Sequence, residues 1–87
     1  MPRKKVPLTT FPRRLRITLA ALDMTSADLM RRTTLGSSQI SEYLNGRNEP
    51  KISSIRTICE ALGVSADFLL GLSDEMWIQK PRKEETE

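Results

Sequence analysis

The sequence contains no histidine and a single cysteine, Cys59, among its 87 residues. Because there is no second cysteine, no intramolecular disulfide can form, and a reducing compartment is favoured. We expect the lone thiol to be a small buried hydrophobe rather than a reactive group. The sequence has no cluster of metal ligands and no nucleophile paired with a base. We therefore expect neither catalysis nor a bound metal or cofactor.

Long apolar runs are missing too. None approaches the roughly 18 residues of a membrane span, and no signal-peptide pattern opens the chain. We therefore expect a soluble cytoplasmic protein without membrane contact. The sequence also lacks strand-like alternation and internal repeats, which predicts an all-α class, and its length fits one domain with tails.

Charged residues are unevenly placed, although the net charge is only +3. The first 16 residues contain no acid and carry a set of basic residues: Arg3, Lys4, Lys5, Arg13, Arg14 and Arg16. Beyond Leu72 the tail is rich in acidic residues: Asp74, Glu75, Glu84, Glu85 and Glu87. Basic arms usually contact nucleic-acid phosphates or acidic membranes, and a solvated arm that only aids solubility is the alternative.

Apolar periodicity predicts five short helices. The first carries one buried stripe: Phe11, Leu15, Leu19 and Leu22. We expect Thr10 to cap its N-terminus, Pro12 to lie in its first turn and Asp23 to end it. Thr25 and Asp28 form a capping-box-like pair at the start of the second helix.

A tight turn, Thr34-Leu35-Gly36, connects the second helix to a third over Ser37 to Leu44. We expect Leu35 to be the buried apolar residue of this turn. Asn45-Gly46 ends the third helix. The inward-facing residues of the two helices are Leu29, Thr33, Ile40, Tyr43 and Leu44.

A polar loop leads to a fourth, amphipathic helix that Gly63 ends. Its apolar face consists of Ile52, Ile55, Ile58, Cys59 and Leu62. Ser65 caps a short fifth helix that runs through Phe68, Leu69 and Leu70 to Gly71. We therefore divide the chain into a flexible basic N-terminal arm at 1–10, a domain at 11–71 and a C-terminal tail at 72–87.

Three segments resemble the phage repressor and Cro-type helix-turn-helix family: MTSADL, SSQISEYLNG and ALGVSADFLLG. The similarity runs without gaps from about Leu15 to Gly71, and the segment RKKVPLT is similar to the basic arm of the lambda repressor. The resemblance implies a compact five-helix, lambda-repressor-like domain with the helix-turn-helix at its second and third helices. It also implies sequence-specific binding to operator DNA, usually as a homodimer on a pseudo-palindrome, with the third helix in the major groove.

Matched position by position, the resemblance implies a base-reading set: Ser37, Ser38, Ser41 and Glu42, flanked by Gln39. Short serines make few direct base contacts, so we expect part of the specificity to come from water or DNA shape. A carboxylate such as Glu42 can accept from the cytosine amino group, and a solvated helix charge is its equal alternative.

The resemblance also implies contacts to the sugar-phosphate backbone from Ser26, Asn45, Arg47 and Lys51. The arm residues that can follow a groove are Arg3, Lys4 and Lys5. For Arg31 and Arg32, a solvated helix face is at least as good an interpretation.

Several positions depart from the family pattern. Met30 occupies a usually small site between the second and third helices, and it must open their angle or slide aside. Thr34 replaces a usual glycine and would be strained at positive φ, while Gly36 replaces a usual capping residue. Leu19 and Leu44 stand where many relatives have a buried ion pair, which predicts their direct contact.

The C-terminal end carries more apolar residues than a small surface usually exposes: Leu69, Leu70, Leu72, Met76, Trp77 and Ile78. We expect this end to form a homodimer, and the alternative is that Trp77 folds back onto the first and fifth helices. The sequence therefore predicts a DNA-binding transcriptional regulator, a repressor of phage or mobile-element type. The alternative function is an antitoxin-like module whose main partner is another protein.

Overall fold

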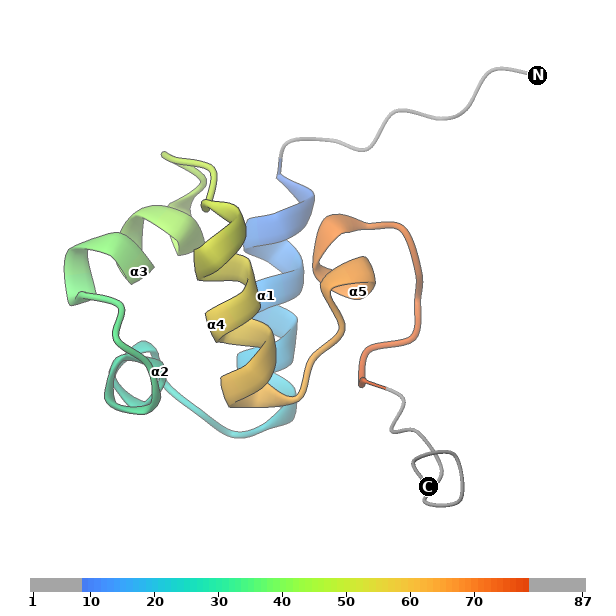
Figure 1. The fold of residues 1–87 in the computed structure, drawn as a ribbon, viewed down its shortest axis with the longest axis horizontal. Helices are drawn as coiled ribbons and strands as arrows, with labels where there is room; N and C mark the ends of the chain where they lie inside the picture. The colour runs from blue at the N-terminus through green and yellow to red at the C-terminus, as the bar shows by residue number, and fades with distance from the viewer. Residues whose placement is uncertain (1–8, 79–87) are drawn as a thin grey trace.

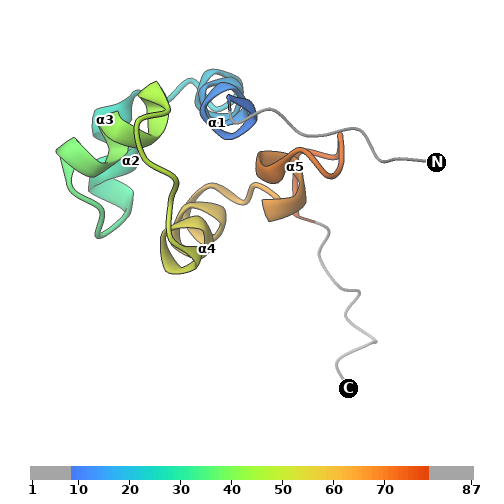
Figure 2. The same cartoon turned by 90° about the horizontal axis from the view of Figure 1, so that it is seen from above.

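The computed structural model describes residues 9–78, which form five helices: α1 (Thr10–Ala21), α2 (Ser26–Arg32), α3 (Ser37–Asn45), α4 (Ile52–Leu62) and α5 (Ala66–Leu70). Helices α1 and α4 lie in the centre, with α2 and α3 together on one side and α5 on the other (Figures 1 and 2). The all-α class is confirmed. None of the helices in this part of the chain is long and apolar enough to cross a membrane.

The N-cap side chains of α2 and α5 accept hydrogen bonds from the first turn of their helices. The Thr25 hydroxyl accepts from the Asp28 N–H at 3.1 Å, and the Asp28 carboxylate accepts from the Thr25 N–H at 2.9 Å. This capping box satisfies donors that the first turn of α2 leaves unpaired. Ser65 caps α5 by accepting from the Phe68 N–H at 3.4 Å.

The N-terminus of α1 differs from the prediction. Thr10 is already helical, so the expectation that it is the N-cap is wrong; Thr9 holds that position and makes no side-chain cap bond. Pro12 lies in the first turn, where its missing N–H costs no helical hydrogen bond.

Left-handed residues end several helices. Gly46 has φ 72° after α3, a left-handed conformation that favours glycine, and a Cβ there would make ordinary van der Waals contact with the Pro12 ring at 3.4 Å. Asp23, with φ 57°, ends α1. It is the only non-glycine residue with positive φ between residues 9 and 78. Thr34 therefore carries no such strain, because the turn is shaped by Thr33, whose hydroxyl accepts from the Leu35 N–H at 3.2 Å.

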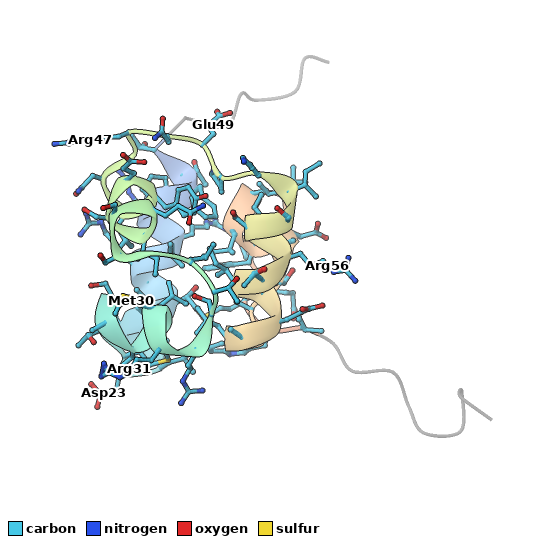
Figure 3. All side chains as sticks on the ribbon, turned by 60° about the vertical axis from the view of Figure 1, so that its left-hand side comes forward. Asp23, Met30, Arg31, Arg47, Glu49 and Arg56 are labelled. Carbon is cyan, nitrogen blue, oxygen red and sulfur yellow. The ribbon has the colours of Figure 1, made fainter. Side chains whose placement is uncertain are left out.

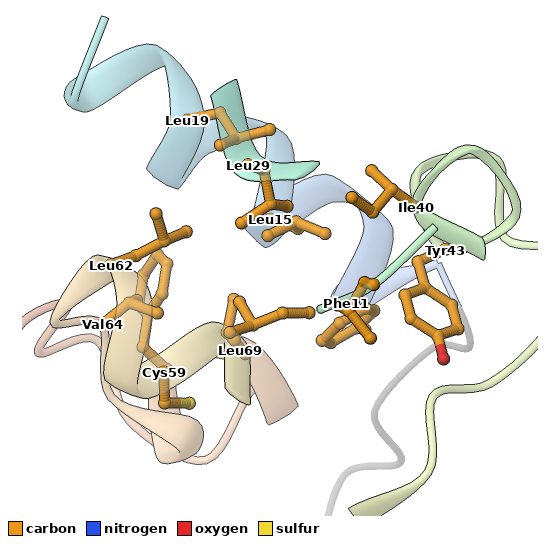
Figure 4. Packing of buried hydrophobic residues seen from close by; sticks show 13 residues of the cluster. Phe11, Leu15, Leu19, Leu29, Ile40, Tyr43, Cys59, Leu62, Val64 and Leu69 are labelled. Atoms are coloured by element: carbon orange, nitrogen blue, oxygen red, sulfur yellow. The ribbon is translucent and has the colours of Figure 1, made fainter. Parts of the chain in front are cut away.

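One hydrophobic core joins all five helices (Figure 4). It contains Phe11, Leu15 and Leu19 of the predicted first-helix stripe, whereas Leu22 is only partly buried against it. Leu35 and Cys59 are also in the core, and burial raises the pKa of the Cys59 thiol. The prediction that Ile52 belongs to the apolar face of α4 is wrong, since its side chain is 86% exposed. It is the first residue of α4, so the helical spacing is right but the core ends before it.

Leu19 is buried, and Leu44 packs against the same cluster. Both leucines therefore contribute to the core, Leu19 within it and Leu44 at its edge. Their direct contact stays a prediction.

The chain turns back after α5. The Ser65 N–H donates to the Met76 carbonyl at 2.7 Å, and the Ile78 N–H donates to the Gly63 carbonyl at 2.9 Å. These bonds place Trp77 opposite Val64 in an isolated bridge. The segment from 73 to 78 therefore lies against the connection between α4 and α5.

Arg14 of α1 holds the same segment. Its guanidinium donates to the Phe68 carbonyl at 3.0 Å and to the Ser73 carbonyl at 2.6 Å, and it pairs with Asp74 at 3.1 Å. It also lies 4.4 Å from the centre of the Phe68 ring, within the range of a cation–π contact. The sequence analysis grouped Arg14 with the basic residues of the N-terminus. In the structure, its side chain connects α1 to α5 and to the returning chain.

Candidate nucleic-acid interface

Helix α3 has a buried side and a polar, open side. Ile40 and Tyr43 are buried, whereas Ser37, Ser38 and Ser41 are exposed. A shallow hollow on the open side is lined by three of the predicted base readers, together with Glu42 and Arg47. The fold thus brings four of the five predicted base readers and one predicted phosphate contact to one face.

Gln39, the fifth predicted base reader, is half-buried and bonded within the protein. Its amide oxygen accepts from the Gly36 N–H at 3.4 Å, and its amide nitrogen donates to the Tyr43 hydroxyl at 3.1 Å. Tyr43 in turn donates to the buried Ser54 hydroxyl at 3.0 Å. Gln39 therefore makes the reciprocal bond of a capping box, to the N–H of the N-cap residue, while the bond that a side chain at Gly36 would make is missing. Through Tyr43, Gln39 also links α3 to α4.

Glu42 is tied to the loop that follows α3. Its carboxylate accepts from the Asn48 amide at 2.6 Å, and its carbonyl accepts from the Arg47 N–H at 2.9 Å. Glu42 is therefore neither a simple solvated charge nor a fully free base reader. Its hydrogen bond positions the loop that carries Arg47.

The C-terminus of α3 is held by a residue from α1. The Arg16 guanidinium donates twice to the Leu44 carbonyl, at 3.1 and 2.7 Å, and once to the Asn45 side chain at 3.3 Å. Asn45 also donates to the Ser41 hydroxyl at 3.3 Å. Sequence reasoning missed this role of Arg16: cations favour helix C-termini, but no local signal indicates which helix an arginine will reach.

The other predicted phosphate contacts are accessible where the structure describes them. Ser26, Arg47 and Lys51 are exposed, and Figure 3 shows Arg47 projecting outward from the loop after α3. Arg31 pairs with Asp28 at 3.0 Å, which supports a structural role on the α2 surface. The arm residues Arg3, Lys4 and Lys5 lie outside the described residues.

Met30 lies between α2 and α3 and is 36% exposed (Figure 3). Its side chain reaches the surface. There it lines a second hollow with Ser26, Ala27, Ser37, Ile40 and Ser41. The two hollows share Ser37 and Ser41, so they are neighbours on one face.

Residues 14–75 match the family model of the Cro/C1-type helix-turn-helix DNA-binding domain. The chain belongs to the Cro/C1-type helix-turn-helix family. No curated protein and no solved structure matches the chain. Membership identifies this Cro/C1-type domain as a DNA-binding regulator, with α2 and α3 as its helix-turn-helix. Between residues 9 and 78, no group of three His, Cys, Asp or Glu side chains could hold a metal ion.

The C-terminal apolar set of this Cro/C1-type domain divides into two parts. Leu69 is fully buried, so its assignment to a dimer surface is wrong: it faces the core from α5. Met76 is partly buried against the same core. The remaining members are exposed by 41% to 62%: Leu70, Leu72, Trp77 and Ile78. The chain therefore turns back on itself and still leaves an apolar surface.

Proposed function

We propose that this protein is a transcriptional repressor of phage or mobile-element type that acts in the cytoplasm. It binds a pseudo-palindromic operator as a homodimer and reads the major groove with α3. One observation carries the proposal: the open side of α3 presents short, exposed polar side chains beside Arg47. A helix of this kind fits the major groove, and the flanking basic residues suit phosphates.

Selection of bound sequences from a random duplex pool tests the proposal most directly. We expect recovery of one palindromic motif, with an affinity that falls steeply as salt rises, because Arg and Lys displace counterions. Recovery of no motif would favour the alternative, an antitoxin-like module whose partner is a protein.

Two variants separate base reading from phosphate contact. Ser38→Ala should change the preference at one or two base pairs by about 1 kcal/mol. Arg47→Ala should weaken binding to all sequences alike and flatten the salt slope. If Arg47→Ala changed base preference and Ser38→Ala changed nothing, the two roles would be reversed.

The homodimer is proposed to form through the exposed apolar residues of the C-terminal end, Leu70, Leu72, Trp77 and Ile78, with the partly buried Met76 beneath them. Two-fold symmetric readers bind half-sites one helical turn apart, which a C2 dimer matches. Leu72→Asp alters a residue that is 62% exposed, so the fold should persist. Sedimentation should show a dimer for the native chain and a monomer for the variant. A native chain that sediments as a monomer even with operator DNA would contradict the dimer.

A further inference from the structure

The hollow between α2 and α3 is the less polar of the two on the α3 face. Ala27, Met30 and Ile40 supply its apolar lining, and Ile40 is only 1% exposed. Hydroxyls surround this lining: Ser26 at the start of α2, with Ser37 and Ser41 on α3. Its volume is about 140 Å³, several times the space that a group the size of a water molecule needs.

The position of this hollow ties it to DNA. It shares Ser37 and Ser41 with the neighbouring hollow that also holds Ser38 and Arg47, so it continues the proposed reading surface. In the major groove of unmodified DNA, the only apolar group larger than a hydrogen atom is the C5-methyl group of thymine. An apolar recess edged by hydroxyls matches that group, since burial of a methyl is favourable and the hydroxyls can meet the polar edges beside it.

We propose that this hollow receives the 5-methyl group of a thymine and that Met30 is the side chain that selects it, an inference that rests on the proposed function. The unbranched thioether of Met30 can adjust its shape to the methyl. The serines on either side are too short to fill the recess themselves. Met30 thus provides a preference for thymine on a surface whose serines make few direct base contacts.

The test uses the full-length protein and the palindromic motif recovered by selection. Each thymine in one half-site is replaced in turn by deoxyuridine, which removes the methyl and leaves the base-pairing edge unchanged. At one position we expect the affinity of the native protein to fall about fourfold, the loss for one buried methyl. Met30→Ala should bind the native motif more weakly and show no further loss with deoxyuridine at that position.

Two matched variants control for folding and for general apolar loss. Ile17→Ala truncates an α1 side chain that is 44% exposed and outside the hollow, and it should keep the full deoxyuridine effect. Met30→Leu keeps an apolar side chain of similar size and should retain most of the sensitivity. Equal melting temperatures among the variants would show that each is folded.

The outcomes are distinct. Tight motif binding with no sensitive thymine, or a motif without thymine, would overturn the role of the hollow and leave the proposed function standing. Equal deoxyuridine sensitivity in the native protein and Met30→Ala would overturn the role of Met30. Failure to select any motif would refute the proposed function, and the inference would fall with it.

Discussion

Arg16 of α1 and Leu44 of α3 are joined by a forked hydrogen bond, in which one guanidinium donates twice to one carbonyl oxygen at 3.1 and 2.7 Å. The last carbonyls of a helix lack partners within it, and a cation there also meets the negative end of the helix dipole. The contact therefore both caps α3 and sets its position against α1.

Arg16→Ala should lower the free energy of unfolding by about 1 kcal/mol and weaken operator binding, because α3 loses its anchor on α1. Arg16→Lys cannot form the forked hydrogen bond, so its stability and operator affinity should lie between those of the native protein and Arg16→Ala. Thermal melts and binding isotherms measure both effects. The control is Arg56→Ala, which breaks an exposed pair with Glu60 on α4 (Figure 3) and should leave binding unchanged.

Arg14→Ala should release the returning C-terminal segment. It removes two hydrogen bonds to carbonyls and the contact over Phe68, and we expect a loss of about 2 kcal/mol in the free energy of unfolding. Hydrogen exchange should speed up at Ile78, whose N–H is paired in the native protein. Asp74→Asn should have little effect, because that side chain is 98% exposed and surface ion pairs contribute little. A large effect of Asp74→Asn would contradict this division of roles.

Tyr43→Phe should reduce stability by about 1 to 2 kcal/mol, because it leaves the Ser54 hydroxyl, 4% exposed, without its donor. Ser54→Ala should cost a similar amount. If the two groups act as one unit, the double variant should lose less than the sum. Additive losses in chemical denaturation would show that the two hydroxyls are independent.

The stability of α2 should depend on acid pH through Asp28. Hydrogen bonding to Thr25, first of all its backbone N–H, lowers the pKa of this carboxyl below its ordinary 3.8. A lowered folded-state pKa means that the charged group stabilises the fold above pH 3.8 and that this contribution is lost as pH falls through the lowered pKa. The melting temperature of the native protein should exceed that of Asp28→Asn near neutral pH and converge with it in strong acid. A pH-independent difference would exclude the charge as the cause.

Leu19 and Leu44 should be energetically coupled if they replace an ion pair by direct packing. Leu19→Ala should cost about 2 to 4 kcal/mol, since Leu19 is only 6% exposed. In a double-variant cycle the coupling energy should exceed about 0.5 kcal/mol. A coupling of zero would mean that each leucine packs against other partners.

Local chemistry made much of the fold predictable. The Thr25–Asp28 capping box, Ser65 and the glycines after α3, α4 and α5 act within a few residues, so their effect is legible in the sequence. Reasoning from helical spacing failed at the end of an apolar pattern, where it placed an exposed residue in the core. Helical spacing includes Ile52, but only the packing of other helices decides where the core stops.

The location of the candidate site could be predicted from the sequence, but the hydrogen bonds of its side chains were not predicted. The matched segments place Ser37, Ser38 and Ser41 on one open face, since Ser41 lies four and three residues beyond the other two, and those spacings share a helix side. The bonds of Gln39 to Tyr43, one turn further along α3, and of Glu42 to Asn48, in the following loop, are local contacts that the sequence analysis did not consider. Only the bond from Tyr43 to Ser54 of α4 is tertiary. A buried tyrosine hydroxyl usually needs a partner, and that signal could have pointed to Ser54.

The sequence by itself determined five short helices, the caps of α2 and α5 and a helix-turn-helix with a serine-rich face, because hydrogen bonds and periodicity within a few residues specify them. Only the tertiary structure decided that Arg14 and Arg16, two residues apart on α1, bind elements on opposite sides of that helix (Figure 1). Arg14 holds the returning chain and Arg16 holds α3. A long charged side chain has no partner of its own in sequence, and its role is set by whichever carbonyls the fold brings within reach.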